Sequence, residues 1–391
     1  MIPLRELAHT DANVAYHMWV LVFPIAWATL QKEEQVTLAK PMITLFSKEY
    51  HAKQQGKRPN VVQALLEGLS LSQPQPKIPS ELIKFLGKTY NAWHIAISLL
   101  ESHVILFPQE TRCFDALAEL YRAINEEDAR FGLWKRRPIT LETRAGLSLV
   151  QHGFWQRAQD VFYQAMSKAT QGGYNNVSKA EMCLWEEQWI GCAKQLSQWD
   201  ILAEFGKSVE NYDILLDCLW KIPDWTTLKD TVLVKAQVEE SPKLRILEAY
   251  VALHLGVLND ADKRVVQGID LALHQWWQFP EMVVQSHFPL LQQFQQLVEL
   301  QESGRVLLEI TNGNKPLSTP QLPGVQSGAG NYIELKEILE IWRSRTPNEW
   351  DDLTVWYDLL QWRNHMYNAV INAFKDLSTS NPQLHQLGYR D

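Results

Sequence analysis

Cysteine is scarce in this chain of 391 residues, which contains four: Cys113, Cys183, Cys192 and Cys218. None belongs to a CxxC pair, and none is followed by a pair of histidines at zinc-finger spacing. Four cysteines in so long a chain are too few for the disulfide framework of a small secreted domain. The cysteine content therefore argues against a disulfide-stabilised protein and predicts an intracellular one.

Long apolar runs are also missing, and the nearest approach to one is residues 14–30. That stretch contains His17 and Pro24 and is shorter than the ~20 residues that a bilayer requires. The residues before it include Glu6 and Asp11, unlike the positive start of a signal peptide. We therefore predict no membrane span here and expect a buried helix that is kinked near Pro24.

The charge balance and the residue pattern exclude further classes. The formal net charge is −8, and a protein that grips DNA or RNA needs a basic stripe, so no direct nucleic-acid partner is expected. No alternating strand pattern is flanked by Asn-Gly or Asp-Gly turns, which argues against a β-sheet. Hydrophobic residues make up 46% of the chain and charged residues 21%, which indicates a folded protein with a core.

Apolar residues recur at intervals of three and four along most of the chain, which predicts an all-α protein. This spacing occupies residues 61–71, 82–106, 114–124, 141–166, 180–205, 244–255, 265–277, 283–310, 332–343 and 353–374. The longest break, residues 311–331, is rich in Gly, Pro, Ser and Asn and is predicted to be a flexible loop. A change of composition near Pro79 predicts a boundary between an N-terminal helical segment, 1–79, and a longer array, 80–391.

One segment has the register of a tetratricopeptide (TPR) hairpin. Gly146, Ala158, Phe162 and Ala165 fall where that repeat has its Gly, Ala, aromatic residue and Ala. Small residues let two antiparallel helices approach closely, and Phe162 would fill the groove between them. Gly153 lies between the two helical runs, where a turn is needed. These residues are therefore predicted to be structural.

The register is not kept along the chain. Residues 185–219 resemble another helix pair, but without the TPR spacing. We therefore predict an α-solenoid of degenerate TPR/HEAT-like helical hairpins of variable length. The sixteen Trp residues are interpreted as anchors of helix packing rather than as the lining of a ligand site.

Glycine motifs that could bind a nucleotide are incomplete. The sequence GKS at 206–208 resembles the end of a phosphate-binding loop, but Ile201 occupies the position of the loop's first glycine. We expect Gly206 to end a helix instead. The sequence GAG at 328–330 follows no predicted strand, so it is interpreted as a loop.

Residue sets for catalysis or metal binding are also missing. No HRD, DFG, HExxH or GxSxG motif occurs. His94 and His103 fit nearby turns of one helix, but no carboxylate or thiol completes a zinc site. The carboxylate runs at 126–128 and 186–187 fit solvated helix faces. We therefore predict no catalytic, cofactor-binding or metal-binding residue, and a protein that is not an enzyme.

The basic tripeptide Lys135-Arg136-Arg137 has two interpretations. Basic residues at the end of a helix complement the helix dipole, which would make them structural. They could instead contact an acidic partner or belong to a nuclear import signal, although three residues are fewer than the usual basic run.

Several longer stretches resemble a known family in their order along the chain. They are KFLGKTYNAW (84–93), LAELY (117–121), EED (126–128), GLW (132–134), QHGF (151–154), LWE (184–186), QWD (198–200) and the segment 348–363 ending in LQWR. They resemble the FAT region of TRRAP-like (transformation/transcription domain-associated) proteins, the pseudokinase branch of the phosphatidylinositol-3-kinase-related kinase family. The likeness covers most of residues 82–367 and includes the apolar stretch around 19–27, and the chain departs from it most in 311–331.

The resemblance implies an organisation and a role. Such proteins are very large, with HEAT repeats, then FAT helical repeats, then a kinase-like domain without catalytic residues. Residues 1–79 would be a HEAT-like segment leading into the FAT region, and residues 80–391 the FAT region itself. The chain would be a non-catalytic, nuclear scaffold segment of a transcription co-activator. Its partners would be subunits of SAGA and NuA4/TIP60-type histone acetyltransferase complexes, transcription activators, and the HEAT and kinase-like parts of its parent chain.

Two alternatives to this scaffold role remain. The segment could be the FAT region of a catalytically active kinase of the same wider family, which motifs downstream in the parent gene would reveal. It could also be a self-sufficient enzyme with a site assembled from scattered residues, although no convergent titratable set is visible.

Overall fold

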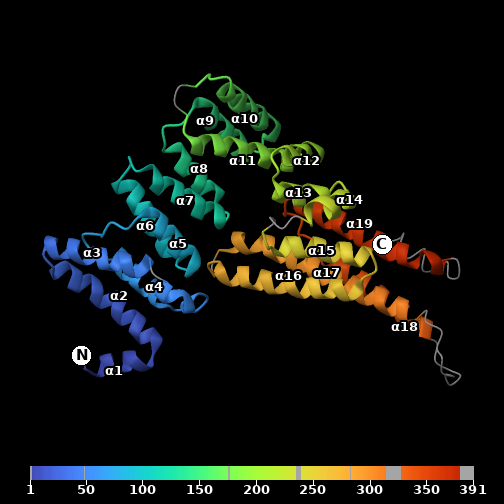
Figure 1. The fold of residues 1–391 in the computed structure, drawn as a ribbon, viewed down its shortest axis with the longest axis horizontal. Coiled ribbons are helices and arrows are strands. Elements are labelled where there is room, and N and C mark those ends of the chain that lie inside the picture. Colours follow the sequence, from blue (N-terminus) through green and yellow to red (C-terminus); the bar gives the residue numbers. More distant parts are fainter. Residues whose placement is uncertain are drawn as a thin grey trace. The chain divides into compact units, whose positions relative to one another are not determined.

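The computed structural model describes residues 2–47, 49–174, 177–234, 239–281, 283–313 and 327–378. Within these ranges every regular element is a helix and none is a strand, so the all-α prediction is confirmed (Figure 1). The first elements are α1 (Ile2–Thr10), α2 (Ala12–Thr29), α3 (Lys32–Ser47), η1 (Glu49–Gln54), α4 (Val61–Ser70), α5 (Ser80–Thr89), α6 (Trp93–Leu106), α7 (Thr111–Ala123), α8 (Glu127–Lys135) and α9 (Leu141–Gln151). The others are α10 (Trp155–Thr170), α11 (Lys179–Gln195), α12 (Trp199–Ser208), α13 (Tyr212–Leu219), α14 (Trp225–Thr227), η2 (Leu228–Val232), α15 (Pro242–His254), α16 (Leu258–Gln278), α17 (Val284–Gly313), α18 (Ser327–Ser344) and α19 (Leu353–Ser378).

The helices are joined by a recurring turn. Asn91, Asn125, Ser197, Glu210 and Gly256 have φ between 52° and 74°, the left-handed region, each just after a helix. In each case the next residue donates its backbone N–H to the carbonyl oxygen five positions back, as Gln198 does to Ala193 at 3.0 Å. This hydrogen bond satisfies a carbonyl that the helix end leaves free. After each of these five helices the chain thus turns within a few residues and enters the next helix.

One predicted helix and one predicted loop have different limits in the structure. The predicted helix 82–106 is divided into α5 and α6 by the left-handed turn at Asn91. The predicted loop 311–331 is narrower, since α17 extends to Gly313 and α18 begins at Ser327; its central part, 314–326, lies outside the described residues. The periodicity did not reveal α1, α3 and α8, which are short or mix polar residues with apolar ones.

The apolar stretch 14–30 forms helix α2 but is not buried as predicted. Pro24 lies inside the helix, which is continuous from Ala12 to Thr29. Val20 and Trp27 are buried, whereas Leu21 and Ile25 are 68% and 70% exposed. The reason is that the packing of α2 against α1 and α4 leaves these two side chains uncovered.

The chain divides into two compact units. The first comprises Met1–Gln151, Lys168–Leu184 and His274–Pro289, and the second His152–Ser167, Trp185–Leu273 and Leu290–Asp391. Each unit has a large core of its own, built from leucine, isoleucine, alanine and aromatic side chains.

In the first unit the turn after α16 packs against residues far away in the sequence. Trp93 Nε1 donates to the carbonyl of Gln278 at 2.7 Å, and Phe279 packs against the same core. The Arg58 guanidinium donates to the carbonyl of Phe279 at 2.9 Å and lies 4.7 Å from the centre of the Trp277 ring. The core of this unit is therefore completed by a segment about two hundred residues downstream.

In the second unit tryptophan anchors the packing of α13, α15 and α19. Trp362 is fully buried and meets Trp220 edge to face, with ring centres 6.1 Å apart. Tyr250 packs between Trp225 and Trp362, with ring centres 4.2 and 5.8 Å away. These contacts agree with the interpretation of tryptophan as a packing residue.

The residues of the TPR register are buried as predicted. Ala158, Phe162 and Ala165 have no exposed surface, and Gly146 is buried in α9. Gly153, with φ of 74°, lies in the turn between α9 and α10. The register therefore identified the buried positions of both helices and the turn between them correctly.

Two helical glycines provide a first prediction. A Cβ atom on Gly87 would lie 2.6 Å from Cβ of Ala96, which cannot rotate away, whereas a Cβ on Gly304 would meet Leu253 at an ordinary 3.6 Å. We expect Gly87→Ala to lower the free energy of unfolding by about 1–2 kcal/mol, since overpacking outweighs the gain in helix propensity. Gly304→Ala should raise it by about 0.5–1 kcal/mol. Urea unfolding of both variants measures the difference, and stabilisation by Gly87→Ala would contradict the close approach of α5 and α6.

Candidate functional site

The structure places both glycine motifs inside helices. The GKS sequence at 206–208 forms the last turn of α12, and Val209 is the C-cap. The expectation that Gly206 ends the helix is therefore wrong, because this glycine instead lets α13 approach: its Cβ would meet Leu215 at 3.1 Å. The GAG sequence at 328–330 lies in the first turn of α18, and not in a loop as predicted. The sequence pattern predicted a helix from residue 332 onward. In the structure this helix, α18, begins at Ser327 and therefore includes the GAG sequence.

The histidines named from the sequence do not converge. His94 is exposed, whereas His103, on the same helix α6, is 2% exposed. Burial lowers the pKa of His103, which favours the neutral ring. Within the described part of the chain, no three His, Cys, Asp or Glu side chains are grouped so that they could hold a metal ion.

The basic tripeptide after α8 is partly used within the fold. Lys135 Nζ donates to Gln151 Oε1 at 2.7 Å. Arg137 Nη1 donates to Asp115 at 2.7 Å, and its guanidinium lies 4.5 Å from the centre of the Trp134 ring. Arg136 is exposed. Two of the three cations thus have structural contacts within the fold.

Three lysines that no sequence motif connects lie near two aspartates in the second unit. Lys194 Nζ donates to Asp217 at 2.6 Å, and Lys243 forms an ion pair with the same carboxylate. Lys221 Nζ donates to Asp358 at 2.6 Å and lies 3.9 Å from the centre of the Trp199 ring. Burial lowers the pKa of Lys221, and Asp358 opposes that change. Each ammonium contacts a carboxylate, and Lys194 and Lys243 share that of Asp217, so the cluster joins helices through ion pairs.

A second polar network is buried between α17, α18 and α19. Arg363 Nη2 donates to Glu299 Oε1 at 2.8 Å and to the carbonyl of Arg345 at 2.9 Å. Glu299 is fully buried and Arg363 is 6% exposed. One helical turn along α17, Glu302 accepts from both Arg345 Nη atoms at 3.1 Å and from Trp342 Nε1 at 2.6 Å. The network links three helices, because its charged groups come from α17, from α19 and from the residue after α18.

Burial raises the pKa of Glu299, and the Arg363 guanidinium opposes that rise. Removal of either partner would leave the other charge buried without a counter-charge, so the stability of the unit depends on both.

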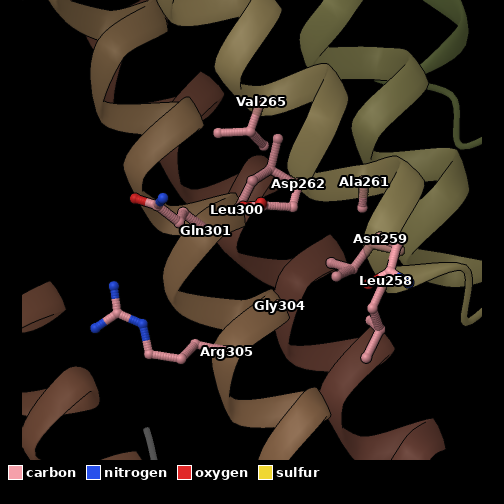
Figure 2. A pocket seen from close by; sticks show the side chains of 10 residues that line it. Leu258, Asn259, Ala261, Asp262, Val265, Leu300, Gln301, Gly304 and Arg305 are labelled. Carbon is pink, nitrogen blue, oxygen red and sulfur yellow. The ribbon is translucent and has the colours of Figure 1, made fainter.

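The second unit also contains a hollow of about 280 Å³ between α16 and α17 (Figure 2). Leu258, Ala261, Val265 and Leu300 form its apolar walls. Asn259, Asp262, Gln301 and Arg305 provide its polar groups, and Gly304 leaves room at one side. Its lining contains neither a nucleophile paired with a base nor two facing carboxylates.

None of the described helices is long and apolar enough to cross a lipid bilayer.

Comparison with known proteins identifies two regions of the chain. Residues 1–72 match the family described as the Tra1 HEAT repeat ring region, and residues 212–380 match the FAT domain family. The SAGA complex/NuA4 acetyltransferase complex subunit TRA1 of Saccharomyces cerevisiae is 34% identical over 410 residues, which cover 99% of this chain and 10% of that protein. The Tra1 protein of Schizosaccharomyces pombe, named as a subunit of the same two complexes, is 34% identical over 90% of this chain and 10% of its own length. Human transformation/transcription domain-associated protein is 29% identical over 96% of this chain and 11% of its own length.

The chain thus spans about a tenth of the length of these relatives. The similarity extends over nearly the whole chain, and the FAT match includes α13 to α19, which carry the core of the second unit. The resemblance predicted from the short sequence stretches is confirmed, and the chain belongs to the Tra1/TRRAP family.

Proposed function

We propose that this chain is a scaffold segment of a transcription co-activator, which holds subunits of SAGA and NuA4-type histone acetyltransferase complexes and contributes to the recruitment of activators. The observation that carries the proposal is the similarity of the entire chain to a protein named as a subunit of both complexes. Successive helical hairpins support it, because such arrays expose long faces suited to protein partners. A nuclear location follows from this role.

The proposed role is non-catalytic. The second unit stabilises its buried charges by pairing them, as Glu299 and Arg363 do, rather than directing them into a cavity. The hollow between α16 and α17 offers apolar walls and a polar rim without a nucleophile–base pair. We assign no direct nucleic-acid contact, in keeping with the net charge of −8.

We further propose that residues 1–79 are a HEAT-like segment and residues 80–391 the FAT region. The ring-region match over residues 1–72 supports the first limit. The exposed side of α2, with Leu21 and Ile25, supports contact with further helical repeats of the parent chain. The FAT match begins at residue 212, so the assignment of 80–211 depends on the helical hairpins described above.

Deletion of residues 80–391 from the tagged parent protein tests the scaffold role. We expect the parent purified from nuclear extract to lose acetyltransferase subunits and their activity. The matched control is Lys336→Ala/Glu340→Ala, which removes an exposed ion pair of α18 and should leave the complex unchanged. An unchanged composition after the deletion would contradict the proposal. Kinase activity in the eluate that disappears on mutation of the parent's own kinase-like domain would instead favour an active kinase.

A further inference from the structure

Helix α16 exposes a stripe of alternating acidic and apolar side chains in the second unit. Asp262, Val266, Asp270 and Leu273 are spaced by four, four and three residues, so they follow one side of the helix. All four are exposed, with Val266 at 47% and Leu273 at 53%. The buried side of the same helix is formed by Ala261, Val265, Gly268 and Ala272. Val266 and Leu273 are therefore apolar residues of α16 that do not belong to the core of this unit.

Helix α17 exposes a second stripe beside the first. Leu291, Val298 and Arg305 are spaced by seven residues, and Leu291 and Val298 are 50% and 37% exposed. Gln301 lies on the same side and, like Arg305, lines the hollow shown in Figure 2. The two acidic residues of α17 in this region, Glu299 and Glu302, form ion pairs with Arg363 and Arg345. They therefore add no unpaired negative charge to the stripe.

The two stripes border one groove. The helices are connected by a short turn and lie side by side, and Leu297 comes so close to Gly268 that a Cβ there would lie 2.8 Å from Leu297 Cδ2 (Figure 1). Asp262 on α16 and Arg305 on α17 both line the hollow, which places the hollow at one end of the groove. Val266 and Leu273 continue away from it along α16, and Val298 and Leu291 along α17. An apolar groove with a deeper seat at one end is the form that receives an amphipathic helix.

The acidic residues of the groove determine which charges an occupant carries opposite them. Its α16 border carries Asp262 and Asp270, eight residues and thus about 12 Å apart, together with the exposed Lys263, which lies seven residues before Asp270 on the same side. Its α17 border is uncharged apart from Arg305 at the end near the hollow. We propose that this groove binds an amphipathic helix of a partner protein that carries two basic residues about two turns apart beside its apolar stripe. One bulky apolar side chain of that helix enters the hollow between Leu258 and Leu300. The inference rests on the proposed scaffold function and specifies the chemistry of one partner.

A peptide-binding experiment tests the groove in the whole 391-residue chain. The probe is a fluorescein-labelled 18-residue helical peptide with a leucine stripe and two lysines eight positions apart; in the matched probe, glutamates replace the lysines. We expect the lysine peptide to bind at least ~10-fold more tightly in fluorescence anisotropy, with a difference that shrinks at high salt. Asp262→Lys/Asp270→Lys should reverse the preference. Asp200→Lys/Glu204→Lys on α12 makes the same change of charge at two exposed acidic residues outside the groove. This variant should keep the preference for the lysine peptide.

The apolar residues of the groove are tested by a separate variant. Val266→Ser/Leu273→Ser should weaken binding of the lysine peptide at least ~10-fold without lowering the melting temperature, because both side chains are about half exposed. Equal binding of the two peptides, or equal effects of the groove and α12 charge reversals, would overturn the proposal. So would self-association of the chain that Val266→Ser/Leu273→Ser abolishes, since the occupant would then be a second copy. If the peptide fails to bind while the parent still copurifies with acetyltransferase subunits, the groove proposal is wrong and the scaffold function stands.

Discussion

Replacing Arg363 with methionine is expected to lower the free energy of unfolding by about 3–5 kcal/mol, because it leaves a buried carboxylate without its cation. Glu299 has no exposed surface, and Arg363 is the only cation among the described residues that contacts it. Gln295, the other partner, donates at 3.2 Å and carries no charge. Chemical unfolding monitored by tryptophan fluorescence suits the measurement, since Trp362 and Trp342 lie in the same core.

The matched control separates burial from charge pairing. Lys336 and Glu340 form an ion pair on α18 with side chains 59% and 60% exposed, and Lys336→Met should change stability by no more than about 0.5 kcal/mol. Glu299→Met/Arg363→Met should recover most of the loss, because an apolar pair of similar volume needs no counter-charge. A double variant as unstable as Arg363→Met would mean that the hydrogen bonds to the Arg345 carbonyl, rather than the buried charge, dominate.

The loss of unfolding free energy caused by Arg363→Met should also depend on pH. Burial raises the pKa of Glu299 above its ordinary value of 4.5, and loss of the guanidinium removes the group that opposes this rise. The folded variant then keeps a proton that the unfolded chain releases, so its stability falls as the pH rises above about 4.5. The difference from the unaltered protein should therefore shrink toward pH 4.5, and a constant difference would contradict the explanation.

Replacing Phe162 with alanine should cost about 3–5 kcal/mol of unfolding free energy, since it opens a cavity at a fully packed position. Phe162 has no exposed surface and is among the largest fully buried side chains of the chain. It belongs to the register of Gly146, Ala158 and Ala165, whose small size permits close packing around an aromatic ring. Phe162→Leu should cost less, about 1.5 kcal/mol, because most of the volume remains.

The neighbouring Tyr163 provides the control for this prediction. Its side chain is 61% exposed on the same helix, α10, so Tyr163→Ala removes a similar ring without opening a cavity. We expect its unfolding midpoint in urea to stay within the range of surface substitutions, about ±0.5 kcal/mol. An unchanged midpoint in Phe162→Ala would show that this side chain is not packed as the structure indicates.

Local pattern was sufficient for most of the helices and for one turn between them. The three-to-four spacing predicted most of the helices, and Gly153 marked the turn between α9 and α10, because a helix that buries one side must repeat its apolar residues with the helical period. The same reasoning failed at other turns. Ser197 and Glu210 adopt positive φ without the glycine or asparagine that usually announces it, so nothing in the local sequence marks these helix ends.

Periodicity also could not tell which apolar side of a helix is covered. Residues 14–30 predicted a buried helix, yet Leu21 and Ile25 are exposed, since burial depends on which helices pack around α2. Similarly, the pattern of α16 predicted a helix but did not reveal that Val266 and Leu273 lie outside the core.

The sequence by itself determined the all-α class, the family and the packing role of Phe162, because helical period, short characteristic stretches and small-residue spacing are properties of neighbouring positions. Only the tertiary structure decided the pairing of Glu299 with Arg363, the grouping of Lys194, Lys221 and Lys243, and the hollow between α16 and α17. Glu299 and Arg363 are 64 residues apart, and their meeting depends on how complete helices stack. That stacking is set by the sum of many apolar contacts, which no short stretch of sequence contains.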